Sequence, residues 1–186
     1  EETGQYNIPY MIKYNVNNAV LIRGYLREQG LIVPRGNPKN IRSIEDLLRG
    51  DVRIVNRNKG AGTRFLLDLK LKEIAAKMGV KFEELVRKVN GYYYEVKTHT
   101  AVAAAVAQGK ADAGVGIRAA AAMYGLDFIP LGWESYDFAI PIDRLEKDSV
   151  KAFLSMLRSD EFRNALSKLP GYRVSDDIGT IIWKGQ

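Results

Sequence analysis

Three cationic side chains surround a glycine-rich turn near the first third of the sequence. Residues 52–68 read Val-Arg-Ile-Val-Asn-Arg-Asn-Lys-Gly-Ala-Gly-Thr-Arg-Phe-Leu-Leu-Asp. This order predicts a short buried strand (52–55), a polar turn (56–62) and an amphipathic helix that Thr63 opens. The free N–H groups and the dipole at a helix start favour negative charge. The segment therefore predicts a site for a small anion, with Arg57, Lys59 and Arg64 beside it.

The same turn has a purely structural interpretation. Gly60 and Gly62 could simply supply positive φ angles between a strand and a helix. The run Gly-Ala-Gly-Thr-Arg lacks the Gly-Lys-Ser/Thr ending of a nucleoside-triphosphate loop, and it does not fit the dinucleotide fingerprint either. Arg57 and Arg64 could equally form surface ion pairs.

A second helix start lies about 40 residues further on. The run Lys97-Thr98-His99-Thr100 leads into an Ala/Val-rich helix at 101–108, with Thr98 or Thr100 as its cap. His99 is the only histidine, and it is either a structural hydrogen-bonding residue or a ligand contact. If both helices follow parallel strands of one sheet, their starts lie at the same edge.

Composition narrows the classes of function. The 186 residues carry a net charge of +6 and no cysteine, which excludes disulfides and thiolate metal sites. With one histidine, a His-cluster zinc site is excluded and a Ser-His-Asp hydrolase is disfavoured. Basic residues are mixed with acidic ones, which favours a solvated basic surface over a nucleic-acid face. We expect no catalytic residue, no metal ligand and no membrane segment.

Strands and helices alternate between residues 44 and 131. This alternation predicts a parallel or mixed sheet with helices on both faces. Within it we expect helices at 44–49 (capped by Ser43), 63–78, 82–89, 101–108 and 118–124, and strands at 52–55, 92–96, 113–117 and 128–131. Outside it we expect a short helix near 9–14, strands at 19–27, 30–34 and 136–140, and helices at 148–158 and 160–169 with Ser159 as a cap.

Several motifs carry a resemblance to a known family. They are Thr3-Gly4-Gln5-Tyr6-Asn7, Gly30-Leu31-Ile32-Val33, the Asn56–Arg64 run, Thr98-His99, Ala111-Asp112-Ala113-Gly114 and Tyr136-Asp137. Together they resemble a type 2 periplasmic-binding-protein-like domain, most closely the one attached to molybdopterin biosynthesis MoeA proteins and to some DNA-binding regulators. The resemblance covers essentially the whole chain.

The resemblance implies an α/β, two-lobed fold. Lobe 2 would be residues 38–137 and complete, and lobe 1 would be residues 1–37 with 138–186 and partial. Family members begin with further segments of lobe 1, and the chain opens at Glu1 without a methionine. We therefore expect a processed product or a piece of a larger fusion protein. The sheet edge left by a partial lobe would invite a homodimer or a swapped lobe 1.

The resemblance also implies a function. We expect a cytoplasmic domain that binds molybdate or tungstate, without a covalent cofactor, in molybdenum-cofactor biosynthesis or its regulation, with a MoeA-type domain as partner. The alternatives are a regulator domain that senses a small organic anion, and a domain that assists metal insertion into molybdopterin. The expected ligand-binding residues are Asn56, Arg57, Gly60, Ala61, Gly62, Thr63, Arg64, Thr98, His99, Thr100 and Tyr136.

Overall fold

The computed structural model describes residues 7–185 and divides the chain into two compact units. Unit 1 is the chain up to Arg27 together with the chain from Trp133 onward, and unit 2 is Glu28–Gly132. Both boundaries fall inside long strands, β1 (Ala19–Val33) and β5 (Asp127–Pro141). The lobe boundaries expected near residues 37 and 138 remain a prediction. The motif residues Thr3–Tyr6 lie outside the part of the chain that the structure describes.

The sheet of unit 2 is mixed, which is one of the two arrangements, parallel or mixed, that the sequence predicted. Its strand order is β3 (Glu95–Val96), β2 (Ile54–Arg57), β4 (Ala113–Ile117), β1 and β5. Strand β2 runs parallel to both β3 and β4, whereas β1 runs antiparallel to β4. All five residues of β4 are buried, as a central strand covered on both faces requires.

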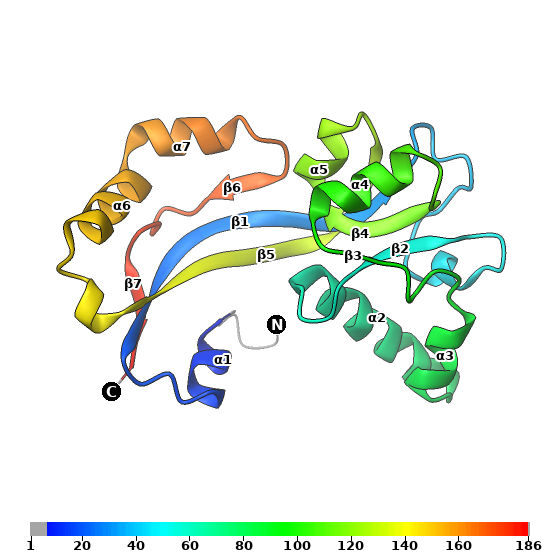
Figure 1. Cartoon of the computed structure of the whole chain (residues 1–186), viewed down its shortest axis with the longest axis horizontal. Helices are drawn as coiled ribbons and strands as arrows, with labels where there is room; N and C mark the ends of the chain where they lie inside the picture. The colour runs from blue at the N-terminus through cyan, green and yellow to red at the C-terminus, as the bar shows by residue number, and fades with distance from the viewer. Residues whose placement is uncertain (1–6, 186) are drawn as a thin grey trace. The chain divides into compact units, whose positions relative to one another are not determined.

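Helices cover both faces of this sheet (Figure 1). On one face, α2 (Gly62–Met78) and α3 (Phe82–Lys88) pack into a cluster with Leu31, Ile54 and Val115. On the other face, α4 (His99–Ala107) and α5 (Arg118–Met123) pack against Ile32 and Val55. The small side chains of α4 therefore have a packing reason, because they let this helix approach the sheet closely.

Gly114 shows how close that approach is. A Cβ atom at this position would lie 2.5 Å from Val102 Cγ1 and 2.8 Å from Val55 Cγ1. We expect Gly114→Ala to lower the free energy of unfolding of unit 2 by about 1–3 kcal/mol, because the added methyl overpacks a closed core. Urea denaturation, monitored through the hydrogen exchange of β4 amides, measures this change in the free energy of unfolding. The control is Gly50→Ala, where a Cβ meets nothing within 4 Å. Equal losses in the two variants would contradict the packing argument.

Unit 1 is built on the remaining halves of β1 and β5. Strands β6 (Tyr172–Val174) and β7 (Ile181–Lys184) pair antiparallel with β1. Helix α1 (Ile8–Lys13) packs beside Leu21, and α6 (Asp148–Arg158) and α7 (Asp160–Ser167) pack against Val20 and Ile22. A 3-10 turn, η2 (Ile142–Arg144), connects β5 to α6. The Ser159 hydroxyl caps α7 by accepting a hydrogen bond from Phe162 N at 3.1 Å, as predicted.

Two pairs of expected strands prove to be single strands. The runs 19–27 and 30–34 form the continuous β1, and the runs 128–131 and 136–140 form the continuous β5. Polar residues at the middle of β1 suggested an interruption. The strand nevertheless continues, because β6 and β7 pair with its first half and β4 pairs with its second half. Backbone pairing with neighbouring strands overrode the local polarity.

The helix expected at 44–49 is a short 3-10 helix, η1 (Glu45–Leu48), and the Ser43 side chain does not cap it. Instead the Asp46 carboxylate accepts hydrogen bonds from Arg42 N and Ser43 N, at 2.7 and 3.1 Å. The strand expected at 92–96 is also shorter, because Gly91–Tyr93 form a turn and only Glu95–Val96 pair with β2. Both errors concern local side-chain and turn hydrogen bonds that compete with a regular helix or strand.

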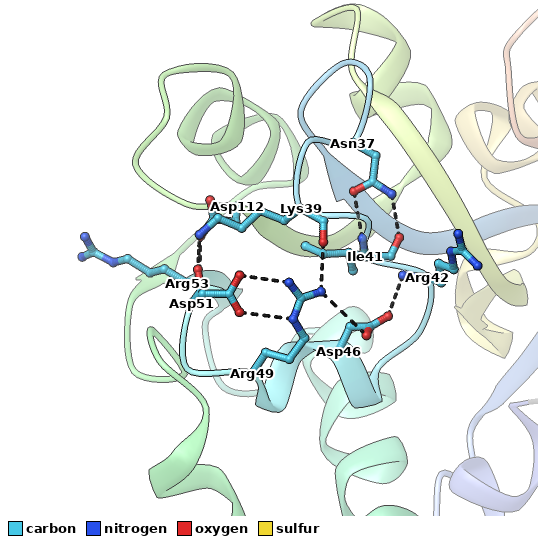
Figure 2. Close-up of polar contacts among 9 residues, drawn as sticks. All are labelled: Asn37, Lys39, Ile41, Arg42, Asp46, Arg49, Asp51, Arg53 and Asp112. Atoms are coloured by element: carbon cyan, nitrogen blue, oxygen red, sulfur yellow. Dashed lines mark hydrogen bonds and ion pairs between the residues drawn. The ribbon is translucent and has the colours of Figure 1, made fainter.

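A polar network fixes the segment that leads into β2 (Figure 2). Arg49 donates to both carboxylate oxygens of Asp51, at 3.1 and 2.9 Å, and to Lys39 O at 2.9 Å. The Asp112 carboxylate accepts from Arg53 N at 2.8 Å and from Lys39 Nζ at 3.1 Å. Asp112 therefore ties the start of β4 to the start of β2, at the edge of the sheet opposite to the helix starts of α2 and α4.

Within residues 7–185, no helix has the length and apolar character needed to cross a bilayer. Among the described residues, strand β5 is the last strand in the order of the sheet, so it is an edge strand of the kind that the expected dimer would use. The expected homodimer and swapped lobe 1 remain predictions.

Candidate functional site

The two helix starts that the sequence singled out lie at the same edge of the unit 2 sheet. Strands β2 and β3 are parallel neighbours with Arg57 opposite Val96, and they lead to α2 and α4 respectively. The two connections stay in contact beyond the strands, since Asn58 N donates to Val96 O at 3.1 Å. Parallel strands that end together place the following helix starts side by side.

Helix α2 starts without a side-chain cap. Its N-cap residue is Ala61, and among the described residues no side chain accepts a hydrogen bond from the N–H groups of Gly62, Thr63 or Arg64. In a helix of 17 residues these first N–H groups have no intrahelical acceptor. The start of α2 is thus a set of converging donors with the positive end of the helix dipole behind them.

Thr63 was expected to open this helix, but it is the second helical residue rather than the cap. It is only 2% exposed, and its Oγ1 atom has no hydrogen-bond partner among residues 7–185. A buried hydroxyl without a partner costs free energy unless something absent from the structure satisfies it. The buried, unpartnered hydroxyl of Thr63 is therefore a stronger indication of a ligand than a hydroxyl already used to cap the helix would be.

The glycines of the turn between β2 and α2 supply its shape. Gly60 has a φ of +87°, and a Cβ there would meet nothing within 4 Å, so the turn conformation alone explains this glycine. Gly62 is exposed, so the helix start is reachable from solvent. The Oδ1 atom of Asn58 is a buried acceptor that has no partner in the described chain.

The start of α4 is capped. Thr98 is the N-cap, and its Oγ1 accepts a hydrogen bond from Ala101 N at 3.0 Å and lies 3.0 Å from Thr100 Oγ1. The sequence allowed either Thr98 or Thr100 as the cap of this helix, and the structure shows that it is Thr98. His99 is the first helical residue and is half-buried, and Thr100 is exposed. These three residues follow the end of β3, where Val96 and Lys97 contact the end of β2 and the β2–α2 connection, and Thr98 is already used as a cap.

Asn56 is a structural residue in this geometry. It is 1% exposed, its Nδ2 donates to Tyr92 O at 3.1 Å, and its Oδ1 accepts from Arg57 N at 2.9 Å. Arg57 continues the connection, since its Nη2 donates to Lys97 O at 2.9 Å. The Asn56 side chain thus ties β2 to the turn before β3, and the Arg57 side chain ties β2 to the residue after β3.

Arg64 is the largest departure from the expected site. The expectation was a cation beside an anion, but Arg64 is 3% exposed and its guanidinium is engaged within the protein. It pairs with Asp68 at 3.0 Å and with Glu95 at 2.8 Å, and it donates to Arg57 O at 3.1 Å. It also lies 4.3 Å from the centre of the Tyr92 ring. We call Arg64, Asp68, Tyr92 and Glu95 the Arg64 cluster.

Two members of the cluster, Arg64 and Tyr92, have raised pKa values. Burial lowers the pKa of Arg64, but its contacts with Tyr92, Glu95 and Asp68 outweigh burial and raise that pKa, so the guanidinium stays charged. Burial raises the pKa of Tyr92 above its usual value; the nearby Arg64 opposes this and Asp68 adds to it. The neutral Tyr92 hydroxyl donates to Asp68 Oδ1 at 2.9 Å. The cluster thus fixes the first turn of α2 against β3.

Sequence reasoning missed Asp68, Tyr92 and Glu95. The spacing of Arg64 and Asp68, four residues apart on one helix, is a usable signal for an ion pair. No local pattern identifies Glu95, because it reaches Arg64 only through the pairing of β3 with β2.

Tyr136 belongs to unit 1, whereas the other ten expected residues belong to unit 2. Its ring stacks on Tyr25, with centroids 5.3 Å apart, and the Arg27 guanidinium lies 4.5 Å from its centre. Arg27 in turn pairs with Glu134. Within residues 7–185, no group of three or more His, Cys, Asp and Glu side chains is arranged to hold a metal ion.

Fold and site together define a class: an α/β domain of two units that share two long strands, with helix starts at the carboxyl ends of parallel strands. Residues 1–158 match a family model described as the PBP superfamily domain. The chain belongs to the PBP superfamily, which confirms the periplasmic-binding-protein-like part of the expectation.

One curated relative is an uncharacterised protein of Bacillus subtilis (strain 168), YvgK, which is 43% identical over 172 residues. That match covers 92% of this chain but only 53% of the relative, so the chain spans about half the length of YvgK. A second is an uncharacterised Clostridium pasteurianum protein, encoded in the 5′ region of a 2Fe-2S ferredoxin gene. It is 34% identical over 89 residues, which are 47% of this chain and 79% of that protein.

Solved structures share the fold at low identity. L-phospholactate-bound PEB3 from Campylobacter jejuni matches with a TM-score of 0.61 and 19% identity, over 83% of this chain and 68% of that one. The sulfate-binding protein SubI from Mycobacterium tuberculosis H37Rv matches with a TM-score of 0.61 and 15% identity, over 83% and 58%. A periplasmic thiamin-binding protein matches with a TM-score of 0.61 and 13% identity, over 84% and 54%.

Proposed function

We propose that this domain binds a small oxyanion at the start of α2, and that its role is recognition without chemistry. The observation that carries the proposal is the uncapped start of α2 together with the Thr63 hydroxyl, which is buried and has no partner in the described chain. The N–H groups of residues 62–64 and the Thr63 hydroxyl would donate to the anion, and the helix dipole would stabilise its charge.

The surroundings of the helix start support an anion in preference to a neutral or cationic ligand. Lys59 and Lys97 are exposed on the two connections, and Arg57 lies between them. Arg64 contributes no net positive charge, because it is paired with two carboxylates. The fold alone does not determine the sign of the ligand charge, since relatives of this fold include proteins named for sulfate and for thiamin. The sign of the ligand charge must therefore depend on the hydrogen-bond donors at the start of α2.

Molybdate or tungstate is the ligand that we propose, on the strength of the MoeA-associated resemblance in the sequence. Both are tetrahedral dianions, and the proposed donors suit that shape. The corresponding biological role is molybdenum-cofactor biosynthesis or its regulation, in a longer cytoplasmic protein with a MoeA-type domain as partner.

A small organic anion is the second candidate ligand. The PEB3 structure of the same fold holds L-phospholactate, a phosphorylated organic acid, and this favours it. Such a ligand would fit a ligand-sensing domain of a regulator. No observation in the described residues favours metal insertion into molybdopterin.

Calorimetric titration tests the proposal directly. Molybdate, tungstate, sulfate, phosphate and L-phospholactate are titrated into the 186-residue protein at constant ionic strength, with choline as a cationic control. We expect saturable binding of at least one anion with a Kd below about 1 mM, equivalent to roughly −4 kcal/mol. Absence of saturable binding for all five anions would contradict the proposed function. A preference for molybdate and tungstate over sulfate would support the molybdenum role specifically.

A further inference from the structure

The Arg64 cluster carries an unbalanced charge beside the proposed anion site. Arg64 is the third residue of α2, so its backbone N–H is one of the proposed donors, while its side chain is paired with both Asp68 and Glu95. One guanidinium against two carboxylates leaves a net charge of −1. An ordinary anion site would use such an arginine to attract the ligand.

The two carboxylates are not equivalent. Asp68 lies on α2 itself, contacts Arg64 through both oxygens at 3.0 and 3.1 Å, and also accepts from the Tyr92 hydroxyl. Glu95 comes from β3, contacts Arg64 Nη1 through one oxygen at 2.8 Å, and has a side chain that is 35% exposed. Asp68 alone can therefore balance Arg64, and the charge of Glu95 is the surplus.

We propose that Glu95 is a specificity-determining residue of the anion site, and this inference rests on the proposed function. Its carboxylate pairs with the Arg64 guanidinium and adds a negative charge next to a residue whose backbone N–H is one of the proposed donors. The repulsion scales with the charge of the ligand, so Glu95 weakens the binding of dianions more than that of monoanions. Glu95 thereby limits the affinity for the proposed dianions and narrows the difference in affinity between dianions and monoanions.

Glu95→Gln tests the inference, because glutamine keeps the shape of the side chain and can still accept a hydrogen bond from Arg64. The Kd values of sulfate and molybdate (dianions) and of nitrate (a monoanion) are measured at constant ionic strength. We expect E95Q to tighten dianion binding by about 10-fold and nitrate binding by only about 3-fold, as expected if the repulsion doubles with ligand charge. The control is Glu84→Gln, which removes the same charge at an exposed position on α3 and should change each Kd by less than about 2-fold.

Each outcome decides the matter. Weaker or unchanged dianion binding in E95Q, an equal gain for nitrate and sulfate, or the same gain in E84Q would overturn the role of Glu95 and leave the anion site standing. If the unmodified protein binds none of these anions, the proposed function fails and the role of Glu95 fails with it.

Discussion

Asp137→Ala is expected to lower the free energy of unfolding of unit 1 by about 3–5 kcal/mol, because it removes the centre of a buried polar cluster. The Asp137 side chain is 0% exposed. It accepts hydrogen bonds from Asn7 Nδ2 at 2.8 Å, Gly24 N at 3.0 Å and Ser135 Oγ at 2.9 Å, and Arg23 lies 3.6 Å away. Alanine would leave these donors and the Arg23 charge without this acceptor.

Tryptophan fluorescence during urea denaturation measures this loss selectively. The chain has two tryptophans, Trp133 and Trp183, and both belong to unit 1. The midpoint of the transition should fall while its slope stays constant.

Asp177→Ala is the matched control for Asp137→Ala. Asp177 also pairs with Arg23, at 3.1 Å, but its side chain is 51% exposed. Burial opposes ionisation of Asp177, yet hydrogen bonds from Arg23 and Ser175 lower the pKa of its carboxyl overall. An exposed pair of this kind is worth less than about 1 kcal/mol. If the two variants lost equal stability, the network centred on Asp137 would not be what holds β1, β5 and α1 together.

Thr63→Val is expected to weaken anion binding by about 10- to 100-fold without destabilising unit 2. Hydrogen bonds to a charged partner are worth about 1.5–3 kcal/mol, and valine replaces the hydroxyl with a methyl of similar volume. The Thr63 hydroxyl has no partner in the described chain, so its removal should leave the free energy of unfolding unchanged or raise it by up to about 1 kcal/mol. Lost binding with retained stability is the signature of a ligand contact.

Two further variants complete the Thr63 experiment. Thr63→Ser keeps the hydroxyl and should retain anion binding within about 3-fold, since the donor group is preserved. Thr180→Val removes an exposed hydroxyl of unit 1 that donates to Asp177 O at 2.7 Å, and it should leave anion affinity unchanged. Calorimetric titration with the best anion and urea denaturation are run on all three variants. Unaltered affinity in Thr63→Val would exclude this hydroxyl from the site.

Local sequence patterns were enough to predict several parts of the structure. The alternation of strands and helices predicted a parallel or mixed sheet, and the structure has a mixed one. Apolar spacing and glycine chemistry predicted a helix at 63–78 with a stop at Gly79, and the structure has it at Gly62–Met78. The Ser159 cap was predicted for the same reason, since its partner lies three residues away. The family-level resemblance also held over residues 1–158.

Which side chains remain available to a ligand depends on contacts between residues far apart in the sequence. Arg64 looked like an anion contact because its charge is visible in the sequence, whereas its partner Glu95 arrives through the pairing of two strands. Thr63 looked like a cap, and it became the main indication of a ligand only when its burial and missing partner were known. Local patterns report propensity and spacing, but hydrogen-bond and ion-pair partners distant in sequence are set by packing.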